Sequence, residues 1–464
     1  MSTHLRSGLT LPATVRLGLF QGCLGCLAVI FSGLLNRIML SELGFPGLLV
    51  GGALAFEQFV APSRVLFGQI SDAHPLASRH RVPYVLIGTA AFCLLAVLSV
   101  PLIFQVGRLL QDGSQPGLAL GIAALCGLFA LYGLAISLAT TPYLALVIDR
   151  TSELERPRAV SIIWCMLTVG IVIGAVAIGV SLRSLDGVND PRVLQAALSR
   201  FMTIVAAVVM LLTVVATWGM ESPLRERTDG TAPRREDAIG LRQSWTLITS
   251  SRQVLIFFSF LILFTLALFL QDPVLESYGA QVFAMPIAAT AQLNAFWGVG
   301  TLVGLLLAGL WVVPRLGKMA TARLGCQLIA LSLLLLLVAG LTARIPFLQA
   351  VMVLFGLAAG IGTNSALCLM LDLTLPQAAG TFVGVWGLAQ ALSRAIGKLL
   401  GGGLYDIGRA LPLGDGPYGP FALVLGVELL VALAALVLLA RVNVRQFRED
   451  TSRSLSQVLE LELG

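Results

Sequence analysis

The sequence predicts an all-α integral membrane protein with twelve transmembrane helices arranged as two six-helix halves. Of its 464 residues, 57% are hydrophobic and 12% are charged, and the mean hydropathy is +0.91. A soluble domain carries about 25% charged residues. Apolar runs of about 20 residues, the length that a helix needs to cross the hydrocarbon core, recur along the whole chain. The net charge of +6 lies in the loops between these runs, so it gives no indication of nucleic-acid binding.

The expected spans differ in length, and the fourth is too long for a simple crossing. They cover residues 17–40, 45–70, 84–106, 118–147, 159–182, 200–220, 253–274, 286–313, 322–342, 347–370, 381–404 and 419–440. We expect the fourth to project into the cytoplasm. The first resembles a signal peptide but continues without a small-residue cleavage site, so we expect it to be retained.

The distribution of basic residues predicts that both termini are cytoplasmic. With this orientation, most Lys and Arg residues lie in or beside cytoplasmic segments, as the positive-inside rule requires. The polar, Pro-containing stretch 221–252 is expected to be a cytoplasmic linker. It separates an N-terminal bundle (1–220) from a C-terminal bundle (253–441), which is followed by a cytoplasmic tail (442–464).

The two halves repeat weakly in sequence. LATTPYLALVIDRT in the first half aligns with IGTNSALCLMLDLT in the second, so that Asp149 matches Asp372. Repeats of this kind build many transporter folds. The counterpart of Arg394 falls near positions 171–172, where the residues are apolar. Its charge is therefore not part of the repeat, which favours a functional role.

The eleventh span carries a concentrated polar face. Trp386, Gln390, Arg394 and Lys398 follow at four-residue intervals, which places them on one side of a helix. A cation at the bilayer centre costs about 2.5–3.5 kcal/mol on insertion scales, so it normally faces protein or a cavity. This face is the principal candidate for a substrate site or for a contact between the halves.

Glu57 in the second span is the expected partner of Arg394. A rise of 1.5 Å per residue places Glu57 roughly 18 Å and Arg394 roughly 16 Å from the lumenal side. Glu428 in the last span, roughly 14 Å deep, is the rival partner. Such a pair would serve either as part of a substrate site or as a lock between the halves, and the sequence leaves both open.

Other polar residues in the spans are secondary candidates. Asn36 and Arg37 close the first span, and Arg37 has the length to reach the membrane interface, as has Arg64 on the cytoplasmic side. Asp272 and Glu276 end the seventh span and are expected at the lumenal surface.

Signatures of enzymes and metal sites are missing from the sequence. The three His residues, at positions 4, 74 and 80, lie at the terminus or in a loop. No Ser-His-Asp set or phosphate-binding loop stands out. Cys23 and Cys26 form a C-x-x-C inside a span, without a second pair, and are expected to pack as small apolar residues. We therefore expect neither enzymatic activity nor a metal site.

The loop after the second span resembles a signature of the major facilitator superfamily. Gly68, Asp72, Arg79 and Arg81 follow the pattern Gly-x-x-x-Asp…Arg. In this pattern a small residue permits close packing, and a carboxylate meets basic partners at the cytoplasmic end of a helix. The inserted AHPLAS lengthens the interval, so solvated loop charges are the alternative interpretation.

Longer strings resemble the PucC/LhaA family of that superfamily. They are LFQGCLGCLAVIFSGLLNRIMLSELGFP, APSRVLFGQISD, RVPY, and DLT, AGTF and WGLAQ between positions 372 and 390. The resemblance implies a membrane assembly factor that delivers chlorophyll or bacteriochlorophyll to light-harvesting or photosystem antenna subunits, or accompanies them. It also implies a photosynthetic (thylakoid or intracytoplasmic) or plasma membrane. Membrane lipid, antenna polypeptides and pigment-synthesis enzymes are the implied partners.

A proton-coupled secondary transporter of a small solute is the alternative function. Glu57 or Asp272 would carry the proton, because intramembrane carboxylates commonly serve this role. In the pigment-handling function, the polar face of the eleventh span would meet a transiently bound pigment. Because no span contains His, its magnesium would be held by a carboxylate, an amide, a backbone carbonyl or water, or the pigment would be held by packing alone.

Overall fold

The computed structural model describes residues 10–112, 115–151, 156–183, 190–221, 252–372, 379–412 and 416–443. The described part is almost entirely helical, and its single extended pairing is the isolated bridge between Leu76 and Arg79. The linker after position 221, up to 251, and the tail from 444 lie outside the described residues, as does Thr374 of the sequence repeat.

Every one of the twelve expected spans contains helix. The helices of the first half are α1 (Leu11–Val29) with the π-helices η1 (Ile30–Leu35) and η2 (Ile38–Glu42), α2 (Gly47–Phe59), α3 (Ser63–Ala73), α4 (Val82–Asp112), α5 (Gln115–Arg150), α6 (Arg156–Ser181) and α7 (Pro191–Thr217). Those of the second half are α9 (Arg252–Phe269), α10 (Leu275–Phe283), α11 (Ile287–Leu307), η4 (Ala308–Val312), α12 (Val313–Leu316), α13 (Lys318–Thr342), α14 (Ile345–Asp372), α15 (Ala379–Ala410) and α16 (Tyr418–Leu439).

Nine helical segments of the described part are long and apolar enough to cross a membrane. Gly47–Phe59 and Leu255–Phe269 are shorter apolar helices. The protein is therefore an integral membrane protein, as its composition predicts. The number of twelve crossings, the cytoplasmic position of the termini and the domain boundaries stay predictions.

The second expected span is two helices rather than one. α2 ends at Phe59 and α3 begins at Ser63, with Pro62 between them. Proline disfavours the helical conformation of the residue before it, which accounts for the break. The first span departs from a regular α-helix in another way, because its last turns are π-helical. Single π-helical turns are frequent at functional sites.

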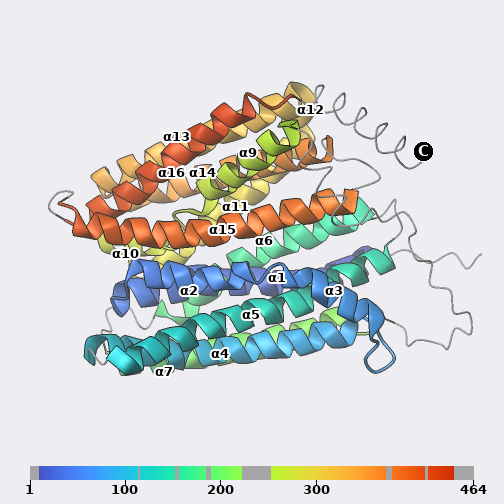
Figure 1. Cartoon of the computed structure of the whole chain (residues 1–464), viewed down its shortest axis with the longest axis horizontal. Coiled ribbons are helices and arrows are strands. Elements are labelled where there is room, and N and C mark those ends of the chain that lie inside the picture. The colour runs from blue at the N-terminus through green and yellow to red at the C-terminus, as the bar shows by residue number, and fades with distance from the viewer. Residues whose placement is uncertain are drawn as a thin grey trace, which may run out of the picture.

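The helices form two groups that lie side by side (Figure 1). In the first group α1 packs on α6 and α7, α4 packs on α5 and α7, and α2 packs on α5. In the second group α14 packs on α11 and α13, and α16 packs on α9 and α13. The groups meet through two pairs of helices, α2 with α15 and α6 with α11. These pairs are the second with the eleventh span and the fifth with the eighth.

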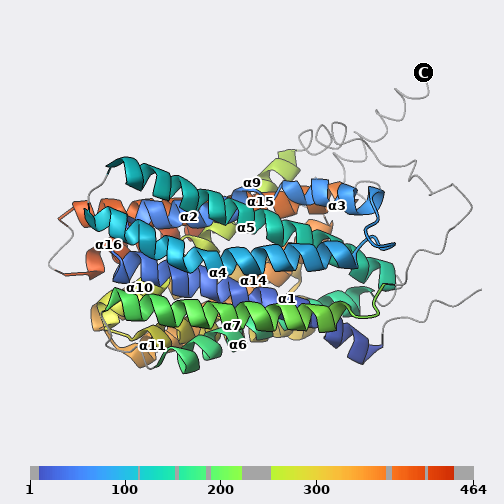
Figure 2. The same cartoon turned by 90° about the horizontal axis from the view of Figure 1, so that it is seen from below.

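The two ends of the bundle differ in the elements they hold. α10 lies at one end and α3 at the other in both views, and Figure 1 shows α12 at the same end as α3 (Figures 1 and 2). The positive-inside prediction makes the α10 end lumenal and the α3 end cytoplasmic. These names are used below for the two ends.

Candidate functional site: a polar layer between the halves

The polar layer lies where the π-helical end of the first span meets the second half. Ser32, Asn36 and Arg37 come from this end of the first span. The second half contributes the turn after α9, the short helix α10, the beginning of α11 and the last third of α15. The close approach of α15 to α2 and to the turn after α9 brings these segments together. At Gly401 and Gly402 an added Cβ would meet the backbone of Leu270 and of Gly47.

Lys398 is neutralised by Asp272 in the centre of this layer. Lys398 Nζ lies 3.8 Å from Asp272 Oδ2 and donates a 3.4 Å hydrogen bond to Ser32 Oγ. Asn36 Nδ2 donates to the backbone oxygen of Asp272 at 3.0 Å, so the first half contacts both this turn and α15. Asp272, whose side chain is 24% exposed, is thus half-buried in the contact between the halves rather than a free group at the lumenal surface, where we expected it.

Arg37 and Glu276 form a second part of the layer. Arg37 donates a hydrogen bond to Thr290 Oγ1 in the other half and lies 3.4 Å from Glu42 Oε1. Its side chain is 6% exposed, so the expected extension to the interface is wrong. Glu276 is 2% exposed and accepts a 2.6 Å hydrogen bond from Asn294 Nδ2. The expected surface position of Glu276 is also wrong.

Arg394 is not paired with Glu57. Its guanidinium carbon lies 4.3 Å from the centre of the Phe269 ring, and no acidic group of the described residues is within ion-pair distance. The carboxylate of Glu57 instead accepts a 3.3 Å hydrogen bond from Gln58. The backbone of Glu57 packs on Gly133 of α5. The expected Glu57–Arg394 ion pair is therefore absent from this conformation.

The helical phase of Glu57 explains why matching depth did not produce a pair. Gly47 and Gly51 are residues of α2 that face α15, and Gly51 lies at the backbone oxygen of Lys398. Six residues after Gly51, at about 100° per residue, Glu57 lies about 120° around the helix, to the side of this contact. The rival partner is not paired either. Glu428 is fully buried, and its carboxylate accepts from the backbone nitrogen of Gln271 at 3.4 Å.

Gln390, Trp386 and Arg64 are the remaining predicted residues of this region. Gln390 is half-buried in α15, one turn before Arg394. The side chain of Trp386 lies outside the described residues. Arg64 lies in the first turn of α3.

Ser32, Thr290 and Asn294 belong to the polar layer but were not predicted. Their signal in the sequence is weak, because small polar residues inside a span are common as helix contacts.

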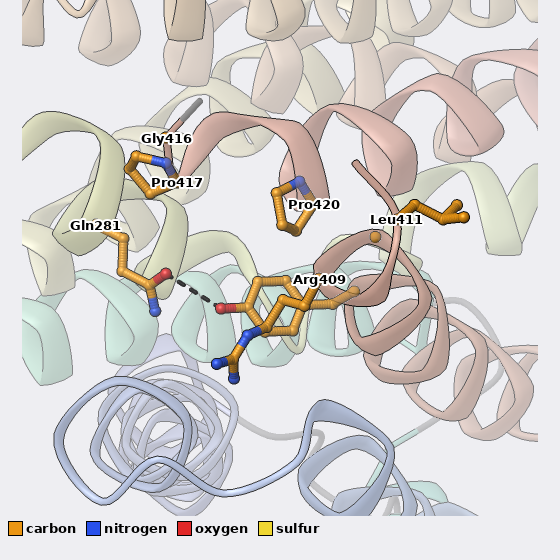
Figure 3. A pocket seen from close by; sticks show the side chains of 8 residues that line it. Gln281, Arg409, Leu411, Gly416, Pro417 and Pro420 are labelled. Carbon is orange, nitrogen blue, oxygen red and sulfur yellow. Dashed lines mark hydrogen bonds between the residues drawn. The ribbon is translucent and has the colours of Figure 1, made fainter. Parts of the chain in front are cut away.

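Hydrogen bonds close the lumenal end between the halves. The carboxylate of Asp406 in α15 accepts from the backbone nitrogens of Gly47 and Leu48 at 2.7 Å each, so it caps the N-terminus of α2. Tyr405 donates to Gln281 Oε1 at 3.1 Å, the dashed line in Figure 3. Gln281 in turn donates to Ser41 of the first half. A pocket of about 230 Å³ adjoins this contact, lined by Gln281, Tyr405, Gly408, Arg409, Leu411, Gly416, Pro417 and Pro420.

At the cytoplasmic end, Arg81 binds groups of two other helices. Its Nε lies 3.2 Å from Asp149 Oδ2 of α5, and its Nη1 donates to Ser71 Oγ of α3 at 2.8 Å. Arg81 is thus a bound residue rather than a solvated loop charge. Arg79 pairs through its backbone with Leu76. The side chain of Asp72 lies outside the described residues.

Two further features order this loop. Gly68 faces α5 closely, because an added Cβ would lie 3.3 Å from Thr141 Cγ2. The carboxylate of Glu221, at the end of the first half, accepts from the backbone nitrogens of His80, Arg81 and Val82 at 2.7–3.0 Å. Glu221 was not predicted, because a carboxylate beyond the last span of the half gives no signal of its spatial partner.

An apolar cavity of about 570 Å³ lies between α1, α6 and α7. Gly22, Cys23 and Cys26 of α1 contribute to its lining, and Arg200 of α7 is the charged group in it. Both cysteines are free thiols, consistent with their expected packing role. Ile173 and Val208, which also line the cavity, are exposed, so it opens to the outside of the bundle.

Comparisons with known proteins place the chain in a family. The family model "PUCC protein" matches residues 34–447. An "Uncharacterized protein in puhA-bchM intergenic region" of Rhodobacter capsulatus is 32% identical over 86% of this chain and 81% of its own length. The "Bacteriochlorophyll synthase 44.5 kDa chain" of the same species is 31% identical over 90% and 92%.

The fold is shared with solved transporters. A bacterial homologue of the iron transporter ferroportin, in an inward-facing state, superposes with a TM-score of 0.67 at 14% identity. The match covers 93% of this chain and 98% of the other. At this identity the likeness concerns the fold alone, and that fold is the major facilitator type that the sequence predicts. The chain is a member of the PucC family, built on the major facilitator fold.

Proposed function

We propose that this protein is a membrane assembly factor of the photosynthetic apparatus, which brings (bacterio)chlorophyll to antenna subunits or accompanies these subunits. The observation that carries the proposal is the PucC family match over residues 34–447. A relative named as a bacteriochlorophyll synthase chain, 31% identical, links the family to this pigment. Antenna or photosystem polypeptides, lipid and pigment-synthesis enzymes are the proposed partners.

Two structural features support a pigment-handling role. The apolar cavity between α1, α6 and α7 opens to the side of the bundle, where a ligand or subunit dissolved in the membrane would approach. The polar layer offers charged groups in the interior, and intramembrane ionisable residues are functional-site candidates by default. An amphipathic pigment needs both an apolar surface for its tail and polar groups for its ring substituents.

The test is a deletion strain of a phototroph that carries this gene. We expect the antenna absorption bands of its membranes to fall severalfold while total pigment extracted into solvent falls less. Re-expression of the wild-type protein restores the bands. Re-expression of Ile396→Leu, a change at an exposed position of α15, restores them equally and serves as the matched control. Unchanged antenna bands in the deletion strain would refute the proposal.

The second candidate is proton-coupled transport of a small solute. Its support is the fold shared with transporters and the intramembrane carboxylate of Asp272, which is bound to a cation from the same half. In proteoliposomes this function predicts solute-dependent proton uptake that Asp272→Asn abolishes. Such uptake in a protein whose deletion leaves antenna bands intact would favour transport over assembly.

A further inference from the structure

Arg394 is an intramembrane cation without the acidic partner that the neighbouring cations Lys398 and Arg37 have among the described residues. Lys398 is paired with Asp272, and Arg37 contacts Glu42 and Thr290. Arg394 has no acidic group of the described residues within ion-pair distance, and its buried Nε has no hydrogen-bond partner among them. Arg394 is half-buried, and a partly desolvated charge without a counter-ion becomes less costly when an anion binds.

The charges around Arg394 do not supply that anion. Asp272, Arg64 and Glu57 are the groups whose charges reach it. The carboxylate of Asp272 is shared with Lys398, and that of Glu57 accepts a hydrogen bond from Gln58. Because Asp272 is paired with Lys398, Arg394 has no acidic group of its own within ion-pair distance among the described residues.

An aromatic surface lies directly beneath the guanidinium. Arg394 stacks over Phe269, and Phe269 lies edge-on to Trp297 with ring centres 6.5 Å apart. Both aromatic side chains come from the second half, on α9 and α11. Aromatic faces favour flat apolar partners and cations. The guanidinium over the Phe269 ring has the planar fork that binds a carboxylate through two parallel hydrogen bonds.

We propose that Arg394 binds the carboxylate of an amphipathic ligand, whose flat apolar body packs on Phe269 and Trp297. Resting on the proposed function, the ligand is a magnesium tetrapyrrole with a free propionate, not the esterified pigment. Esterification removes the negative charge that Arg394 requires. A phospholipid phosphate is the other source of an apolar anion, and the experiment separates the two.

The test compares the free acid with the ester on the wild-type protein. Purified protein in nanodiscs of neutral phosphatidylcholine is titrated with chlorophyllide a and, separately, with chlorophyll a, followed by fluorescence. We expect the free acid to bind about tenfold more tightly, which corresponds to about 1.4 kcal/mol. Because this comparison uses unaltered protein, it does not depend on the folding of any variant.

Variants assign the preference to Arg394. Arg394→Leu removes the preference for the free acid, and Arg394→Lys retains part of it, since an ammonium keeps the charge but loses the fork. Phe269→Leu weakens the binding of both pigments. Ile396→Leu binds as the wild type does. Melting curves of each variant identify those that do not fold, which are excluded from the comparison.

Three outcomes would overturn the proposal. Equal binding of the two pigments refutes recognition of the carboxylate but leaves pigment handling intact. Displacement of the free acid by phosphatidic acid, with the same dependence on Arg394, assigns the site to a lipid phosphate and refutes the tetrapyrrole. Binding of neither pigment refutes the ligand class. The proposed function itself is judged separately, by the antenna bands of the deletion strain.

Discussion

Arg394 and Lys398 lie one turn apart on α15 yet have different surroundings. Lys398 is buried between Asp272 and Ser32, whereas Arg394 stacks on Phe269 without an acidic partner among the described residues. The difference arises because Asp272 lies in the turn after α9, where it can reach only one of the two cations. Lys398 therefore links α15 to the turn after α9 and to the first span, whereas the proposed role of Arg394 is to bind a ligand.

The pairing of Lys398 with Asp272 predicts a non-additive effect on stability. Lys398→Leu and Asp272→Leu each leave one buried charge unpaired, and we expect each to lower the free energy of unfolding by about 1–3 kcal/mol. The double variant removes both charges and is expected to lose less than the sum. Reversible unfolding in mixed micelles measures all four proteins. A double variant that loses the full sum would show that the two side chains do not interact.

At the scale of the element, α15 contacts α2 and the end of α9 through glycines. An added Cβ at Gly402 would collide with the backbone of Gly47, and one at Gly401 with that of Leu270. Gly403, the next residue, faces open space apart from an ordinary contact with Leu48. Gly401 and Gly402 thus permit close backbone contacts, whereas Gly403 does not, and the sequence alone does not distinguish them.

Substitution of adjacent glycines tests this arrangement. We expect Gly402→Ala to destabilise the protein by about 1–3 kcal/mol, because it overpacks the contact with α2. Gly403→Ala is the matched control, and it should be neutral or stabilising by up to about 1 kcal/mol, since Ala favours helix over Gly. Melting temperatures in detergent compare the two. Equal effects at both positions would contradict the close contact at Gly402.

The cap that Asp406 provides to α2 predicts a local effect at the lumenal end. We expect Asp406→Ala to lower stability by about 1 kcal/mol, the usual cost of losing a capping side chain. It should also raise the rate at which a cysteine introduced at Ser41 reacts with a membrane-impermeant maleimide. Arg409→Ala, an exposed change one turn away on α15, is the control and should alter neither quantity.

Helix positions could be predicted from the sequence, but side-chain partners could not. Each of the twelve apolar stretches contains helix, because a backbone in lipid must satisfy its own hydrogen bonds, although the second stretch is divided into α2 and α3. Depth along a helix brought Glu57 level with Arg394, but it did not account for the rotation of α2 about its axis. Asp272 was assigned to the surface because it ends an apolar stretch, whereas the turn that carries it contacts Asn36 of the first half. The sequence segments shared with the PucC/LhaA family predicted the fold and the family. They are spread over most of the chain and do not depend on any single side-chain contact.

For the whole molecule, the two halves meet along α2 with α15 and α6 with α11, and hydrogen bonds join them at the lumenal end. These contacts do not depend on the connection through residues 222–251. A chain divided there would keep both interfaces. We therefore expect residues 1–230 and 240–464, co-expressed as separate polypeptides, to associate.

Co-purification through a tag on one half measures this association. The matched control carries Gly402→Leu, which places a bulky side chain in the α2–α15 contact and is expected to reduce recovery of the partner half severalfold. Recovery that is independent of Gly402, or halves that insert in the membrane without associating, would contradict the interface described here.

The contact of Glu221 with the loop before α4 has a consequence for biosynthesis. The backbone nitrogen of Val82 donates to the carboxylate of Glu221, which is synthesised 139 residues later in the chain. At about 5–20 residues per second, the ribosome reaches it roughly 7–28 s later. Until then the first turn of α4 has no cap from this side chain. The nascent first half can therefore acquire this contact only after the ribosome has passed position 221, so its loop before α4 matures late in the synthesis of that half.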